Sequence, residues 1–229
     1  GRPKEGEDFL RESLAMRKQV YGPEHPEIGL GLNNLGSVLF EEGKLEEAEK
    51  IYREALAMDR KILGQHPQVS TELQNLAGLM VQRKDLSGAA QMVREALDID
   101  RQVYGPNHVN VAPALEKLSA VLELAGKLGE AEQAARECLQ IREKALPNDW
   151  ATFKARAQLG AKLLVQKKFA EAEPLLLAGY AGLKEREPLI PAGSKKHLTA
   201  ALRRLVELYE QSGQPDKAAE WKQKLPAPN

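Results

Sequence analysis

The sequence predicts an all-α fold: a right-handed solenoid of about five helix-turn-helix pairs preceded by a lone helix. Three observations lead to this prediction. Apolar residues recur at spacings of three and four, which is the period of an amphipathic helix. The pattern itself repeats every 41 or 42 residues along the chain. Glycine followed by proline separates most of the repeats, as is typical of helix ends.

The stretch 32–56 shows one repeating unit. Its first half carries Leu32, Leu35 and Leu39 on one helical face, and its second half continues the pattern after a short polar turn. Small residues such as Gly36 lie inside the apolar stripes, where a large side chain would hold two helix axes apart. The unit is therefore predicted to be a pair of closely packed helices.

A small residue marks the same position in the second helix of each unit. The marker residues are separated by steps of 42, 41, 42, 41 and 46, and they are Gly6, Ala48, Ala89, Ala131, Ala172 and Ala218. We predict a half-repeat and turn at 1–26, full repeats at 27–68, 69–109, 110–149 and 150–194, and a degenerate capping pair at 195–229. Because the first segment matches only a second helix, the sequence is expected to be part of a longer protein.

These residues resemble the tetratricopeptide repeat. The resemblance rests on the pair Leu35-Gly36, on Ala48 twelve residues after the glycine, and on Tyr52 and Ala55 beyond it. The period is longer than the usual one of about 34 residues, and the long form resembles the repeats of kinesin light chain and of many bacterial signalling and scaffold proteins. The resemblance implies a protein-interaction scaffold that binds a peptide segment in its concave groove.

The last 80 residues or so resemble the carboxy-terminal end of tetratricopeptide regions attached to bacterial serine/threonine protein kinases. This resemblance implies an alternative function, a region that regulates such a kinase, recruits its substrates or mediates self-association. A third interpretation is architectural: the groove stays empty, and an exposed terminal repeat associates with other copies of the chain.

Composition favours a protein partner over a nucleic acid or a membrane. Lys plus Arg and Asp plus Glu both number 33, so no net field attracts polyanions. No apolar run approaches the 18 residues or so of a membrane span, and a cytoplasmic location is expected. The acidic residues are expected on outward helix faces, where they keep the array hydrated. The single cysteine, Cys138, is interpreted as a small buried residue, with a reactive thiol as the alternative.

We find no constellation that predicts catalysis, a cofactor or a metal site. The sequence has no glycine-rich phosphate loop, no HExxH and no GxSxG, so a non-enzymatic function is expected. His25, His66 and His108 recur at one position of the connection between repeats. Equivalent residues of a solenoid lie a full helix pair apart, too far to share an ion, so a structural role in the turn is favoured.

The candidate binding residues lie on the first helix of each pair, which lines the concave surface in stacked helix pairs. Those predicted to contact a peptide are Asn33, Asn34, Ser37, Gln74, Asn75, Gln82, Lys117, Lys154 and Gln158. Amide side chains both donate and accept, so they can pair with the backbone of an extended peptide. The resemblance to peptide-binding family members assigns this role to Asn34 and Asn75; the alternative is local hydrogen bonding on the helix face. For Lys117 and Lys154 the alternative is a solvated surface.

Overall fold

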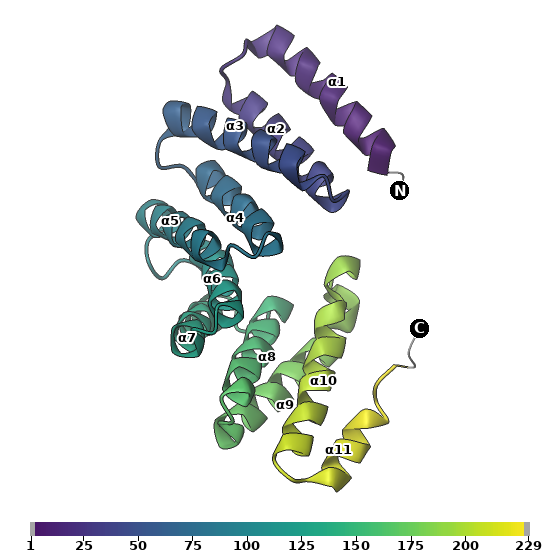
Figure 1. Cartoon of the computed structure of the whole chain (residues 1–229). Coiled ribbons are helices and arrows are strands. Elements are labelled where there is room, and N and C mark those ends of the chain that lie inside the picture. The colour runs from purple at the N-terminus through teal and green to yellow at the C-terminus, as the bar shows by residue number, and fades with distance from the viewer. Residues whose placement is uncertain (1–2, 227–229) are drawn as a thin grey trace. The chain divides into compact units, whose positions relative to one another are not determined.

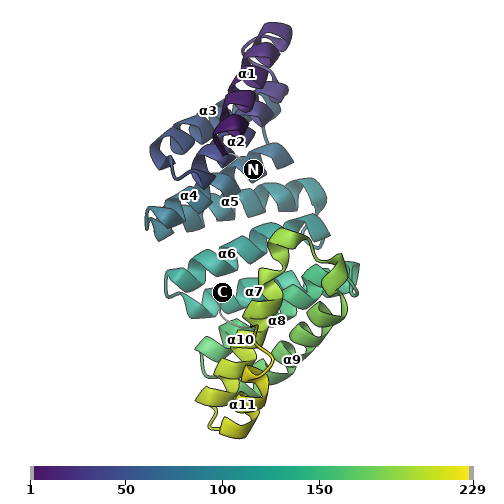
Figure 2. The same cartoon turned by 90° about the vertical axis from the view of Figure 1, so that its right-hand side faces the viewer.

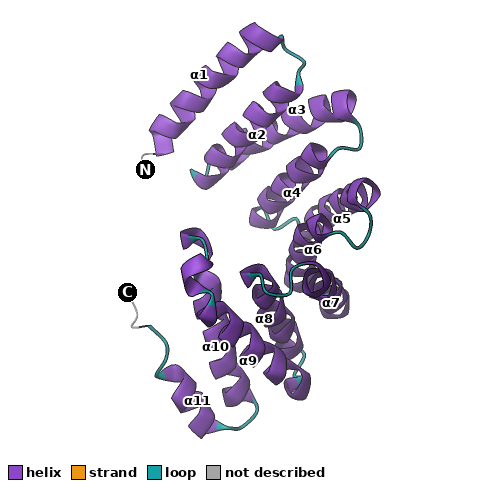
Figure 3. Cartoon of the chain, turned by 180° about the vertical axis from the view of Figure 1, so that it is seen from behind, coloured by secondary structure: helices purple, strands orange, loops and turns teal. Residues whose placement is uncertain are grey.

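The computed structural model describes residues 3–226, and these residues form α-helices and short 3-10 turns without any β-strand (Figures 1 and 3). The chain divides into two compact units, Gly1–Val121 and Leu122–Asn229. We describe each unit by itself. None of the helices within residues 3–226 combines the length and the hydropathy needed to cross a lipid bilayer.

The first unit is a succession of helices, of which the first five pack each against the next, and the fifth contacts the 3-10 turn that follows it. Its helices are α1 (Pro3–Tyr21), α2 (Pro26–Glu41), α3 (Leu45–Leu63), α4 (Pro67–Gln82), α5 (Leu86–Tyr104) and most of α6 (Ala112–Leu124), which follows the 3-10 turn Val109–Val111. The first helices of consecutive pairs, α2 and α4, also contact each other. This contact brings first-helix side chains of neighbouring pairs onto a common face.

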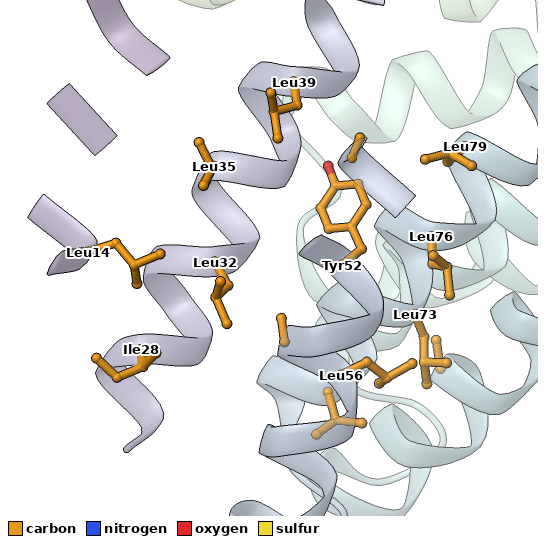
Figure 4. Close-up of a cluster of buried hydrophobic side chains, with 14 of the residues drawn as sticks. Leu14, Ile28, Leu32, Leu35, Leu39, Tyr52, Leu56, Leu73, Leu76 and Leu79 are labelled. Carbon is orange, nitrogen blue, oxygen red and sulfur yellow. The ribbon is translucent and has the colours of Figure 1, made fainter. Parts of the chain in front are cut away.

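The apolar stripes predicted from the sequence form the core of the first unit. Leu32, Leu35 and Leu39 of α2 are buried among side chains of α1, α3 and α4 (Figure 4). A Cβ atom at Gly36 would lie 2.7 Å from two ring carbons of Tyr52, so only glycine lets α2 approach this ring. The prediction that small residues mark close helix contacts is therefore confirmed at this position.

The second unit contains α7 (Leu128–Ala145), α8 (Trp150–Val165), α9 (Phe169–Glu185), α10 (Lys196–Gln211) and α11 (Pro215–Lys222), seen in Figure 2. Two 3-10 turns, Glu187–Leu189 and Ala192–Ser194, lie between α9 and α10. As in the first unit, the first helices of consecutive pairs, α8 and α10, contact each other. Trp150 packs against the apolar cluster that joins α8, α9 and α10.

The recurring histidines cap helices. The Nδ1 atoms of His25, His66 and His108 each accept a hydrogen bond from the backbone N–H two residues later, at 3.2 Å. Such a bond satisfies one of the free N–H groups in the first turn of a helix. The predicted structural role in the turn is therefore confirmed, and residues 3–226 hold no cluster of three or more His, Cys, Asp or Glu side chains suited to a metal ion.

The expectation that acidic residues lie on outward faces is wrong for four of those that the structure describes: Glu7 is 8% exposed, and three others are buried more deeply. Asp59, Glu72 and Asp100 are buried, with at most 4% of their surface exposed. Asp59 lies directly against the backbone of Gly29, where a side chain would collide with its carboxylate. The missing Cβ of a glycine on the facing helix thus creates room for a buried charge, which helical periodicity cannot predict. Cys138 is buried, as expected.

Candidate functional site

A polar pocket opens on the first unit between α4, α5 and the start of α6. Its volume is about 310 Å³. We name it the amide pocket, and it is lined by Pro67, Ser70, Thr71, Gln74, Asn75, Asp100, Tyr104, Asn110, Pro113 and Lys117. Three of the predicted binding residues, Gln74, Asn75 and Lys117, therefore meet in one cavity.

The groups of the amide pocket are held in place by hydrogen bonds. Lys117 Nζ donates to the backbone oxygen of Gln74 at 2.7 Å, which ties α6 to α4. Burial lowers the pKa of the Lys117 amine and raises the pKa of the Asp100 carboxyl. Asn75 Nδ2 donates to Asn33 Oδ1 at 2.8 Å, so the amide of Asn75 is fixed by the preceding pair. The pocket is thus preorganised, with donors from α4 and α6 and an acidic group from α5 in its lining.

The structure places the other predicted residues of the first unit outside the pocket. Asn33 is buried, and its side chain accepts the bond from Asn75 instead of facing solvent. Ser37 donates to the backbone oxygen of Asn33 at 3.0 Å and accepts from the hydroxyl of Tyr52 at 3.1 Å. Asn34 and Gln82 are exposed on α2 and α4. Asn33 and Ser37 therefore hydrogen-bond within the first unit, and so does Asn75, for which local hydrogen bonding was the alternative to peptide contact.

A second polar surface lies on the second unit, across α8, the end of α6 and α10. Two adjoining hollows of about 220 Å³ and about 730 Å³ share His197, Ala200 and Arg204. We name their combined lining the basic surface. It consists of Glu123, Lys154, Ala157, Gln158, Ala161, Lys162, Lys196, His197, Thr199, Ala200, Ala201, Arg203, Arg204 and Glu207. The predicted residues Lys154 and Gln158 belong to it.

Positive charge dominates the basic surface, with five Lys and Arg side chains against two carboxylates. Lys162 pairs with Glu123, and Arg204 Nη1 lies 2.5 Å from Glu207 Oε2. Lys196 and Arg203 are exposed, and neither has a carboxylate partner within residues 3–226. Four alanines, at 157, 161, 200 and 201, also line the smaller hollow.

Reasoning from the sequence missed several residues of both sites. Asp100, Tyr104 and Asn110 were missed because the prediction considered only first helices, whereas the amide pocket also uses α5 and the connection after it. On the basic surface, Lys162 and Lys196 were missed. The sequence did hold a clue: Lys162 lies four residues after Gln158, and Lys195-Lys196-His197 forms a short basic run.

Comparisons with known proteins agree with the repeat fold. The family model described as tetratricopeptide repeat matches residues 1–61, 27–102 and 68–144. No curated protein matches the chain in sequence. The crystal structure of BtubC (BKLC) from P. vanneervenii is similar over 100% of this chain and 96% of its own, with a TM-score of 0.81 and 19% identity.

Two further solved structures share the fold. A putative kinesin light chain with nearly identical repeats from Podospora anserina is 18% identical, with a TM-score of 0.72 over 88% of this chain and 94% of its own. YrrB, a tetratricopeptide repeat protein with an unusual peptide-binding site, is 18% identical, with a TM-score of 0.53 over 93% of this chain and 88% of its own. These similarities confirm the predicted all-α repeat fold and its likeness to kinesin light chain. The chain belongs to the tetratricopeptide repeat family.

Proposed function

We propose that the chain is a non-enzymatic protein-interaction scaffold, and that the amide pocket of the first unit binds a peptide segment of a partner protein. The observation that carries the proposal is the meeting of Gln74, Asn75 and Lys117 in a cavity of about 310 Å³. Amides and an ammonium group at one wall can pair with the N–H and C=O groups of an extended backbone. The family supports this proposal, since YrrB is described as having a peptide-binding site.

The pocket is suited to holding one or two residues of a peptide. Its volume is near the lower end of the roughly 300–1,000 Å³ typical of ligand sites. Asn75 and Lys117 already hydrogen-bond within the protein, so little side-chain freedom is lost when a ligand arrives. Asp100 offers an acceptor for a ligand N–H, and burial raises the pKa of this carboxyl.

We expect the double substitution Gln74→Ala and Asn75→Ala to weaken peptide binding by roughly 10-fold to 100-fold. This estimate assumes that each lost hydrogen bond contributes about 0.5–1.5 kcal/mol. The probe is a peptide selected from a random display library on the unmodified chain, and its affinity is measured by isothermal titration calorimetry. Circular dichroism at 222 nm establishes that the variant is folded.

The matched control is Gln91→Ala, which removes an amide at an exposed position of α5 outside the amide pocket. The affinity of this variant for the peptide should stay within about twofold of that of the unmodified chain, as expected for a surface position. A folded double variant that binds the peptide as tightly as the control would contradict the assignment of the amide pocket.

A second function, self-association, is favoured by the exposed face of α1. Phe9, Met16 and Val20 are 68%, 53% and 74% exposed. The equivalent side chains of α3, Ile51 and Met58, are partly buried against the core. The same repeat position is thus packed in one helix and open in the other, and large exposed apolar side chains are typical of interaction surfaces.

If the exposed face of α1 mediates self-association, the molar mass measured by multi-angle light scattering should rise with protein concentration across a dilution series. Phe9→Glu combined with Val20→Glu should abolish the increase, because each carboxylate would have to be buried in the interface. The control, Gln91→Glu combined with Gln102→Glu, adds the same charge at exposed positions of α5 and should leave the increase unchanged. A mass that does not depend on concentration would rule out self-association. The role beside a bacterial protein kinase stays a prediction from resemblance alone.

A further inference from the structure

We infer that the basic surface of the second unit binds a phosphorylated side chain of a peptide ligand. The inference rests on the proposed function only in taking the ligand to be a peptide, and it concerns a surface separate from the amide pocket. Three features of the surface lead to it: the excess of positive charge, the internal ion pairs that are already formed, and the absence of Phe, Tyr and Trp from the lining.

The excess of charge indicates an anionic ligand. Five Lys and Arg side chains face two carboxylates, and Lys196 and Arg203 are exposed without a carboxylate partner within the described residues. Like charges gathered on one surface repel each other, and an incoming anion relieves this repulsion. Because α8 and α10 contact each other, the charges of both helices act on the same ligand.

The internal ion pairs favour a phosphate over a carboxylate. Arg204 is held by Glu207 at 2.5 Å, and Lys162 is held by Glu123. A ligand carboxylate would bring one negative charge to Arg204. Glu207 already supplies this charge, and because it is part of the chain it loses no translational freedom by doing so. A phosphate monoester carries a charge of about −1.5 to −2 and has three acceptor oxygens. It can therefore accept from Arg203 and Arg204 together while Glu207 keeps its own bond.

The shape of the surface also suits such a group. Alanines at 157, 161, 200 and 201 line the smaller hollow, and Ala200 also lines the larger hollow with Lys196, Arg203 and Arg204. Their small side chains leave room for a ligand group beside the cations. Arginine presents a planar fork of donors that matches the oxygens of a phosphate. Recognition of phosphorylated motifs by clusters of arginine is a recurring mode of peptide binding.

The lining argues against single-stranded nucleic acid, which carries phosphates as well. Proteins that bind single strands combine a basic groove with aromatic side chains on which the bases stack. None of the residues that line the basic surface is Phe, Tyr or Trp. A ligand whose other groups are amino-acid side chains is therefore the better fit.

The test uses the full chain and three matched peptide libraries. Each library has randomised positions around a central residue, which is phosphoserine, aspartate or serine. The best phosphoserine sequence and its Asp and Ser counterparts are then measured by fluorescence anisotropy. We expect the phosphopeptide to bind about 10-fold to 100-fold more tightly than either counterpart, as expected for one or two charge-assisted hydrogen bonds. The preference for the phosphopeptide should decrease when the salt concentration is raised from about 50 to about 300 mM, because salt screens surface charges.

The variant for the test is Lys196→Glu combined with Arg203→Glu. It should remove most of the preference for phosphoserine, with a loss of at least about 30-fold in affinity for the phosphopeptide. Neutral Lys196→Gln combined with Arg203→Gln should give an intermediate loss. The matched control, Lys144→Glu combined with Lys167→Glu, makes the same change of charge at exposed positions outside the basic surface and should bind like the unmodified chain.

Each of four results would overturn the inference. The first is equal affinity for the phosphoserine, aspartate and serine peptides, and the second is a phosphoserine preference that survives the Lys196→Glu and Arg203→Glu changes. The third is displacement of the phosphopeptide by inorganic phosphate at the same concentration as the phosphopeptide. The fourth is a single-stranded oligonucleotide that binds more tightly than any peptide. Variants of Gln74 and Asn75 report separately on the amide pocket, so the proposed function can stand when this inference fails.

Discussion

Gly179→Val is expected to lower the free energy of unfolding of the second unit by about 3 kcal/mol, the upper end of what overpacking typically costs. A Cβ atom at this position would lie 2.7 Å from the backbone nitrogen of Ala157 and 3.0 Å from its Cα. These atoms belong to the backbone of α8, so no side-chain rotation can relieve the collision. The helices α8 and α9 would have to move apart, and the apolar cluster around Leu183 would be loosened.

The matched control for Gly179 is Gly78→Val, because Gly78 also lies within a helix but no atom approaches the site of its Cβ within 4 Å. Valine and glycine differ in helix propensity by only about 0.5 kcal/mol, so the control should change stability little. Urea unfolding followed by circular dichroism gives the overall loss, and hydrogen exchange of α8 and α9 gives the local one. Equal stability of the two variants would mean that α8 and α9 do not pack as described.

Glu72→Gln is expected to stabilise the first unit at pH 8 and to remove most of its pH dependence between pH 5 and 9. The side chain of Glu72 has no exposed surface, and no group within residues 3–226 donates a hydrogen bond to its carboxyl oxygens. Burial, followed by the nearby Asp59, raises the pKa of Glu72 to about 9. Glutamine keeps the shape and removes the titration.

The direction of the effect follows from proton binding. In the unfolded chain Glu72 loses its proton near its ordinary pKa of 4.5, whereas in the folded unit it keeps the proton up to about pH 9. Between these values the unfolded state binds fewer protons, so stability decreases with rising pH, by at most about 1.4 kcal/mol per unit. The contribution of Glu72 is complete below pH 4.5 and is lost above pH 9. At pH 8 we therefore expect Glu72→Gln to raise the free energy of unfolding by about 3 kcal/mol. This is less than the full pKa difference would give, because the surroundings of a buried charge relax.

The measurement is the urea midpoint of the first unit at several pH values, with Glu12→Gln as the control at an exposed position of α1. The difference between the two variants isolates the buried carboxyl from all other titrating groups. Glu7, whose pKa is lowered to about 2 by hydrogen bonds from Lys44 and Arg11, ionises below this window and contributes no slope to it. If the urea midpoints of the two variants change with pH in parallel, the raised pKa assigned to Glu72 is wrong.

Sequence periodicity was sufficient to predict the helices and the core of each pair. Leu32, Leu35 and Leu39 lie on one face of α2 by their spacing alone, and the structure buries all three. Gln74, Asn75 and Lys117 were predicted to lie on the groove face of first helices, and all three line the amide pocket. Such predictions succeed where a single helix, or a fixed offset between helices, determines the environment.

The predictions that failed depend on pairs of residues that only the packed structure brings together. Asn33 was expected to face a ligand, but Asn75 on the next pair gives it a buried partner 42 residues away. Asp59 was expected to be hydrated, but Gly29 on α2 leaves space for its carboxylate, and Gln68 Nε2 donates to Asp59 Oδ2 at 2.5 Å. Neither partner is recognisable from local spacing, since each lies on a different helix.

The hydrogen bonds around Asn33 connect the amide pocket to the centre of the first unit. Asn75 donates to the side chain of Asn33, Ser37 donates to the backbone oxygen of Asn33, and Tyr52 donates to Ser37. Asn33 thus bonds the amide pocket through its side chain and the buried phenol of Tyr52, by way of Ser37, through its backbone oxygen. Comparing the ultraviolet absorbance of the unmodified chain with that of Tyr52→Phe would separate the response of this phenol from that of Tyr104, which lines the amide pocket itself.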